Sequence, residues 1–117
     1  MKRDMELIRH LLLLIEADRD TKSIGGFTKD EIKYHKYLLI ENGLAAGTVL
    51  PDPSSSLGIP ADVHIRKLTW EGHNFIGAIS SDSKWQSVRD FIRESGRQIT
   101  LETVKTAISE LIGHLSK

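Results

Sequence analysis

The sequence predicts an α+β fold in which five helices accompany one β-hairpin, and two observations carry this prediction. Apolar residues recur at helical spacing in five segments, and two segments with strand character flank a loop rich in proline, serine and glycine. The chain has 117 residues, of which 39% are hydrophobic and 27% charged, as in an ordinary soluble domain. We therefore expect a single domain over residues 1–117, with a core over 1–81 and a helical extension over 82–117.

Each expected helix has an apolar stripe, and some also have clear end signals. The first carries apolar side chains at i, i+3, i+4 and i+7 counted from Ile8. The second is the best defined, because Thr28 and Glu31 have the spacing of a capping box and Asn42-Gly43 favours a left-handed end. The helices are expected at residues 5–17, 28–42, 70–80, 84–95 and 101–115.

The hairpin is expected to form between the second and third helices. Residues 62–69 alternate, with Val63 and Ile65 on one face and polar side chains on the other. Residues 44–50 also have strand character, and the segment between the two contains three prolines, three serines and a glycine. We expect the two strands to pair antiparallel around a long tip.

Two fragments resemble the winged-helix class. Residues 38–44, Leu-Leu-Ile-Glu-Asn-Gly-Leu, look like the end of a winged-helix recognition helix. Residues 68–72, Leu-Thr-Trp-Glu-Gly, look like the step from the wing into a following helix. The resemblance implies a winged-helix-like core, made of helices plus a β-hairpin wing, with two additional C-terminal helices.

The whole chain also resembles a family of small bacterial and prophage-associated proteins that form a domain of unknown function. The resemblance rests on Met-Lys-Arg-Asp-Met at residues 1–5, the pair Tyr34-His35, and Leu-Thr-Trp-Glu-Gly-His at residues 68–73. The helix of Trp85, followed by a last helix, agrees with it. The likeness implies a fold and a length, and it brings no activity with it.

No catalytic, metal-binding or cofactor-binding site is expected. The chain has no cysteine, and its five histidines lack the spacing of a metal site. His35 lies on an apolar helix face and is expected to be a hydrogen-bonded core residue. Glu71 and His73 are two positions apart on a helix, so their side chains point away from each other. We therefore expect a protein that is not an enzyme and needs no metal or cofactor.

One surface pattern is typical of nucleic-acid binding. Three lysines recur at i, i+4 and i+7 on the second helix, opposite its apolar face and beside a tyrosine, and the second strand adds an arginine–lysine pair. An ordinary solvated helix face explains the lysines equally well, because acidic residues lie on the same helix. The candidate DNA contacts are Lys29, Lys33, Lys36, Tyr37, Arg66 and Lys67.

Two functions remain open. The fold class favours a DNA-binding regulator or accessory factor of a bacterium or prophage. The alternative is a protein–protein interaction module with a degenerate helix-turn-helix. Two features support it, because sixteen basic residues balance sixteen acidic ones and Thr28 leaves no room for a supporting helix between Gly26 and Gly43.

Two apolar segments bear on whether the chain forms a homodimer and on where in the cell it is located. The last helix carries a stripe that either covers the core or pairs with a second copy of the chain. The apolar run at residues 11–15 is too short for a signal peptide or a membrane span. Together with the absence of cysteine this predicts a cytoplasmic protein that does not enter a membrane. The residues of this stripe, which would form the contact if the chain is a homodimer, are Val104, Ile108, Leu111 and Leu115.

Overall fold

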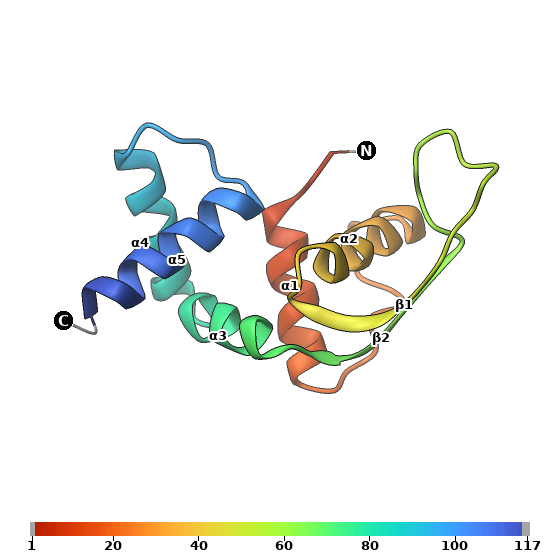
Figure 1. The fold of residues 1–117 in the computed structure, drawn as a ribbon, viewed down its shortest axis with the longest axis horizontal. Coiled ribbons are helices and arrows are strands. Elements are labelled where there is room, and N and C mark those ends of the chain that lie inside the picture. Colours follow the sequence, from red (N-terminus) through yellow and green to blue (C-terminus); the bar gives the residue numbers. More distant parts are fainter. Residues whose placement is uncertain (1, 116–117) are drawn as a thin grey trace. The chain divides into compact units, whose positions relative to one another are not determined.

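A computed structural model describes the backbone of residues 2–115 and the side chains of residues 2–110. Five helices and a two-stranded antiparallel sheet confirm the predicted α+β class (Figure 1). Each predicted helix and strand is present, with its ends shifted by at most two residues. The elements are α1 (Met5–Glu16), α2 (Lys29–Glu41), β1 (Ala45–Leu50), β2 (Asp62–Leu68), α3 (Trp70–Ile79), α4 (Asp82–Glu94) and α5 (Leu101–Leu115).

The chain divides into two compact units, Met1–His73 and Asn74–Lys117, and the division falls within α3. In the first unit, α1 packs on α2 and on β2, and α2 packs on both strands (Figure 1). No helix separates α1 from α2, so the supporting helix of a helix-turn-helix is absent from residues 18–27. The core of this unit is built mainly from branched aliphatic side chains, among them Leu7, Ile8, Leu11, Leu12, Ile32, Leu39, Leu44 and Val63.

His35 joins the two helices of the first unit. Its side chain is 0% exposed. The backbone N–H of Asp4, the N-cap of α1, donates to His35 Nε2 over 2.8 Å. Nδ1 lies 2.7 Å from the carbonyl oxygen of Glu31. Because Nε2 accepts, Nδ1 carries the proton and donates, which identifies a neutral ring. The expected core histidine is confirmed.

The capping box of α2 is formed as predicted. The N–H of Glu31 donates to Thr28 Oγ1 over 3.1 Å, and the N–H of Thr28 donates to Glu31 Oε1 over 2.9 Å. Both bonds satisfy donors that have no partner inside the helix. The cap therefore sets the first residue of α2.

Replacing Thr28 with alanine should lower the free energy of unfolding by about 1 kcal/mol, because the N-cap oxygen is lost. Urea denaturation measures this change. Thr28→Ser is the matched control, since it keeps the hydroxyl and should retain most of the stability. Equal losses in the two variants would mean that the hydroxyl does not cap the helix.

The end of α2 and the start of α3 meet in one junction. Gly43, at φ 73°, ends α2 in a Schellman motif, with the Gly43 N–H donating to Ile40 and the Leu44 N–H to Leu39. Thr69 then links the two ends, because its hydroxyl donates to the Gly43 carbonyl over 2.6 Å and accepts the Gly72 N–H over 3.0 Å. The two fragments that resemble the winged-helix class are therefore in direct contact.

A β-bulge lies near the base of the hairpin. Ala46 pairs with Lys67 while Gly47 pairs with Ile65, so Arg66 is an extra residue in β2. In a regular strand Val63 and Leu68 would face opposite sides, because side chains alternate. The bulge allows both to be buried.

In the second unit, α4 packs on α5. Ser81 caps α4, since its hydroxyl accepts the Lys84 N–H over 3.2 Å. The Arg89 guanidinium lies 5.4 Å from the ring centre of Trp85, which is buried. Val104 and Ile108 of α5 are also buried, whereas the side chains of Leu111 and Leu115 lie outside the described residues.

Candidate functional site

Lys36 does not lie on a solvent face, and the expectation that it does is wrong. Its side chain is only 8% exposed. The buried residues of α2 are Ile32, His35, Lys36 and Leu39, which follow the i, i+3, i+4, i+7 pattern. Lys36 therefore occupies a position on the apolar stripe of α2. The signal was present in the sequence, because Lys36 lies four residues after Ile32 and three before Leu39.

The other candidate residues of α2 are only partly free. Lys33 Nζ donates to the carbonyl oxygen of Ala61 over 3.3 Å and lies 3.6 Å from Asp30 Oδ1. The Tyr37 hydroxyl donates to the Glu41 carboxylate, and this bond raises the pKa of the Tyr37 phenol. Lys29 is exposed. The predicted stripe thus contains one exposed lysine, one lysine bonded to the hairpin and one buried lysine.

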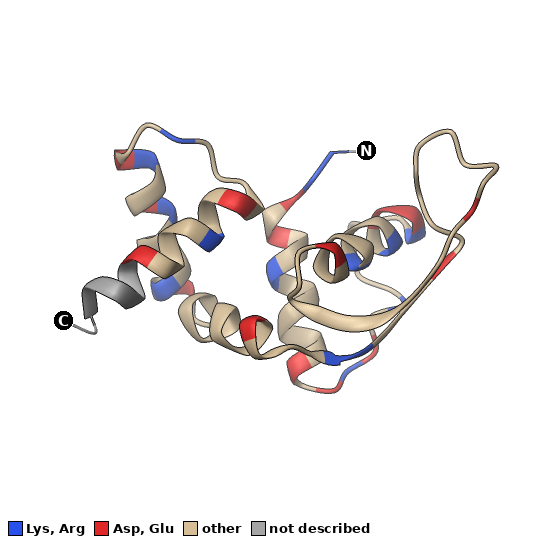
Figure 2. Ribbon diagram, viewed as in Figure 1, with Lys and Arg blue, Asp and Glu red and all other residues tan. Residues whose placement is uncertain are grey.

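The basic pair of the hairpin lies at its base and not at its tip. Arg66 and Lys67 are exposed at the end of β2, about 13 Å along the strand from its first residue. The tip, residues 51–61, contains neither lysine nor arginine, as Figure 2 also shows. It does contain Asp52, whose pKa is lowered by hydrogen bonds from Ser54. The tip of the hairpin is therefore negatively charged at neutral pH.

A polar cleft of about 530 Å³ lies within the first unit, and no pattern in the sequence predicted it. It is bounded by the end of α1, the loop of residues 18–22, strand β2 and Lys36. Its lining contains five lysines and arginines, four aspartates and glutamates and two histidines. The loop and the strand are 40 residues apart in sequence, so no local signal indicates the cleft.

The charges around Lys36 shift the pKa of its ammonium group in opposite directions. Burial lowers the pKa of its ammonium group, Asp62 and Asp20 raise it, and Lys22 lowers it, with burial the largest effect. Asp62 accepts the Val63 N–H over 2.9 Å, and Asp20 accepts the Lys22 N–H over 2.8 Å. Within the part of the chain that the structure describes, no hydrogen bond or ion pair reaches the Lys36 ammonium.

Lys36→Met should change how stability depends on pH. Between the lowered pKa of Lys36 and the ordinary value of 10.5, the unfolded chain binds more protons than the folded chain. The stability of the wild type should therefore rise with pH, relative to the variant, as this window is crossed. At neutral pH the variant should be at least as stable, because it removes the cost of desolvating the ammonium group.

Urea denaturation from pH 7 to pH 10.5 measures the difference between wild type and Lys36→Met. Lys29→Met is the control, because it removes an exposed lysine from the same helix. A Lys36→Met advantage that stays constant or grows with pH would contradict the assignment.

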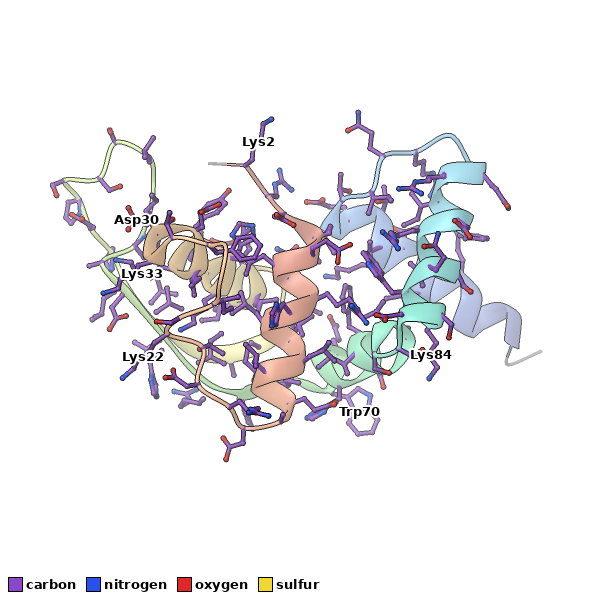
Figure 3. The ribbon with its side chains drawn as sticks, turned by 180° about the vertical axis from the view of Figure 1, so that it is seen from behind. Lys2, Lys22, Asp30, Lys33, Trp70 and Lys84 are labelled. Atoms are coloured by element: carbon purple, nitrogen blue, oxygen red, sulfur yellow. The ribbon has the colours of Figure 1, made fainter. Side chains whose placement is uncertain are left out.

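Trp70, at the start of α3, is 82% exposed. Figure 3 shows its ring pointing away from the ribbon into open space. Two leucines of the hairpin, Leu50 and Leu57, are also exposed. Trp70 belongs to a motif that the sequence shows, but the motif does not indicate whether the ring is buried or exposed.

The part of the chain that the structure describes contains neither a cluster of metal-binding side chains nor a membrane-spanning helix. No group of three or more histidine, aspartate or glutamate side chains there could hold a metal ion. Over the same residues, no helix is long and apolar enough to span a membrane. Glu71 and His73, considered above for acid–base chemistry, are both exposed.

Comparison with known proteins places the chain among relatives without an assigned activity. The family model described as Hypothetical protein (DUF2513) matches residues 2–98. An uncharacterized protein of Haemophilus influenzae is 28% identical over 121 residues, which cover 98% of this chain and 98% of that protein. No solved structure matches the chain. The expected resemblance to a family of unknown function is confirmed, and an association with prophages stays a prediction.

Proposed function

We propose that this chain, which belongs to the family described as Hypothetical protein (DUF2513), is a protein-interaction module on a winged-helix-like scaffold. One observation carries the proposal: the two elements with which a winged helix would contact DNA present no row of free cations. Lys36 of α2 is buried and Lys33 is bonded to Ala61. The tip of the hairpin has no basic residue.

The balance of basic and acidic residues also favours a protein-interaction module over a DNA-binding protein. The unit Met1–His73 contains ten lysines and arginines against eleven aspartates and glutamates. Non-specific DNA affinity comes from neutralising phosphates with basic side chains, and a domain without a basic excess has little of it. The absence of a helix in residues 18–27 also removes the element that crosses the DNA backbone in a helix-turn-helix.

Trp70 is the residue that we place at the centre of the contact with a protein partner. Tryptophan is enriched among the residues that dominate protein–protein binding energy, because it buries a large rigid surface and keeps one hydrogen-bond donor. Thr69 caps α3 immediately before it, so the backbone that carries the ring is held in place. Arg66 and Lys67 are exposed a few residues earlier and favour a partner with acidic groups around an apolar anchor.

A DNA titration tests whether the chain lacks affinity for DNA, as the proposal requires. Fluorescence anisotropy with a labelled mixed-sequence duplex, from low to moderate salt, should give no saturation at protein concentrations up to about 10⁻⁴ M, the weak end of non-specific binding. The sharpest comparison is the triple variant with alanine at Lys29, Lys33 and Lys36, which should behave like the wild type. Salt-dependent binding that the triple variant loses would restore the DNA-binding function.

Photo-cross-linking in cells tests whether Trp70 contacts a protein partner. A photoreactive amino acid at position 70 should give a discrete cross-linked protein species, and the same group at Lys29, on α2, should give none. Co-expressed wild-type protein should reduce the cross-link by competition, whereas co-expressed Trp70→Ser should not. The stability of Trp70→Ser should stay within about 0.5 kcal/mol of the wild type because the ring is exposed. Cross-links from position 29 but not from position 70, or cross-links to nucleic acid, would contradict the proposal.

The proposal includes a cytoplasmic location, supported by the absence of cysteine. It includes no catalytic role, because Glu71 and His73 are two positions apart on α3, so their side chains point away from each other. A homodimer through α5 is not part of it, since Val104 and Ile108 are already buried in a single chain.

A further inference from the structure

The Lys36 ammonium is a charge without a direct counter-ion beside a cleft that reaches solvent. The side chain is more than nine-tenths buried, and the residue lines the cleft. Asp62 and Asp20 raise the pKa of this ammonium, but among the described residues neither carboxylate forms an ion pair with it. Each accepts the backbone N–H of a nearby residue. The buried stem of Lys36 therefore holds the ammonium group at the open cleft, where no group of the described residues pairs with it directly and a ligand can.

An anionic group is the partner that such an ammonium lacks. A carboxylate or phosphate oxygen accepts charge-assisted hydrogen bonds, which are stronger than those between neutral groups. Lys22, from the loop, adds a second positive charge to the same cleft. Figure 3 shows Lys22 and Lys33 on the side of the hairpin.

The rest of the cleft limits the class of ligand. A bare polyanion would be repelled by the carboxylates of Asp20 and Asp62, whereas hydroxyl or amino groups can donate hydrogen bonds to them. A cleft of about 530 Å³ has the size of a small-molecule site and is far larger than a single inorganic ion.

We propose that this cleft binds a small molecule with an acidic group, a phosphate or a carboxylate, that pairs with Lys36, and with hydroxyl or amino groups that face Asp20 and Asp62. A sugar monophosphate and an amino acid both have this chemistry. The site is separate from Trp70, which does not line the cleft, so the two proposals stand or fall independently.

The test is a ¹H–¹⁵N NMR titration of the full chain with glucose 6-phosphate and with glutamate. Glucose and potassium chloride at matched ionic strength are the reference additions. At least one acidic probe should give saturable shifts concentrated at residues 18–22 and 62–68, and neither reference should do so. Saturation by the phosphate alone assigns a phosphorylated ligand, and saturation by glutamate alone assigns an amino acid.

Lys36→Met should weaken this binding by roughly tenfold or more, the loss expected when a hydrogen bond to a charged group disappears. Lys36→Gln is the second variant, in case the first folds poorly, and the same loss is expected. Lys29→Met, on the exposed side of α2, should bind like the wild type. No saturable shift with either acidic probe, or equal binding by the wild type and a folded Lys36 variant, would overturn the proposal.

Discussion

Replacing Gly72 with alanine should destabilise the protein by roughly 3 kcal/mol or more, a large part of the total stability of a small domain. A Cβ atom at this position would lie 2.0 Å from the carbonyl oxygen of Leu44 and 3.0 Å from its carbonyl carbon. Both are backbone atoms, so no side-chain rotation relieves the clash. The backbone itself would have to move.

The backbone cannot move there without breaking the junction between α2 and α3. The Leu44 carbonyl accepts the Thr69 N–H over 3.1 Å, and the Thr69 hydroxyl holds both the Gly43 carbonyl and the Gly72 N–H. Separating the two helix ends would therefore cost several hydrogen bonds at once. It would also disturb the end of α2, whose last turn leads into β1.

Gly77→Ala is the matched control, because Gly77 lies in the same helix and a Cβ atom there would meet no neighbouring group within 4 Å. Alanine there should raise stability by about 0.5–1 kcal/mol, the usual gain from removing glycine inside a helix. Urea denaturation of both variants decides the matter. A tolerated Gly72→Ala would show that the junction is not the tight contact described above.

His35→Ala is expected to cost about 3 kcal/mol or more, the second largest effect. The substitution leaves a cavity between α1 and α2 and removes the partners of the Asp4 N–H and the Glu31 carbonyl. His35→Leu fills most of the volume and still removes both hydrogen bonds. It should therefore cost less than alanine but remain clearly destabilising.

Amide hydrogen exchange locates the effect of these His35 variants. Protection should fall first at the start of α1, where the Asp4 N–H is bonded to the ring. His10→Ala, on the exposed side of α1, should change stability by less than about 0.5 kcal/mol. Unchanged protection of α1 in His35→Leu would mean that the histidine does not anchor this helix.

Local chemistry made the elements predictable from sequence. The capping box of Thr28 and Glu31 and the left-handed end at Gly43 each depend on residues a few positions apart, and both are formed. The apolar stripes predicted all five helices for the same reason. His35 was also predicted as a core residue, because its place on an apolar face decided its burial.

The position of Lys36 shows where local reasoning from sequence failed. Its charge predicts an exposed side chain, whereas its spacing places it on the apolar stripe of α2, which the hairpin covers. A lysine can be buried when its long apolar stem packs in the core and its charge reaches a polar cleft. Whether such a cleft exists depends on the loop of residues 18–22 and on β2, which are distant in sequence.

The sequence by itself therefore determined the helices, the strands, their caps and the family, because each depends on neighbouring residues or on a motif. Only the tertiary structure decided which faces remain free. It placed the bulge at Arg66, joined Gly43 to Thr69, exposed Trp70 and enclosed Lys36. The physical reason is that exposure and charge pairing are set by contacts between elements, and an apolar or charged side chain has the same local signature whether or not another element covers it.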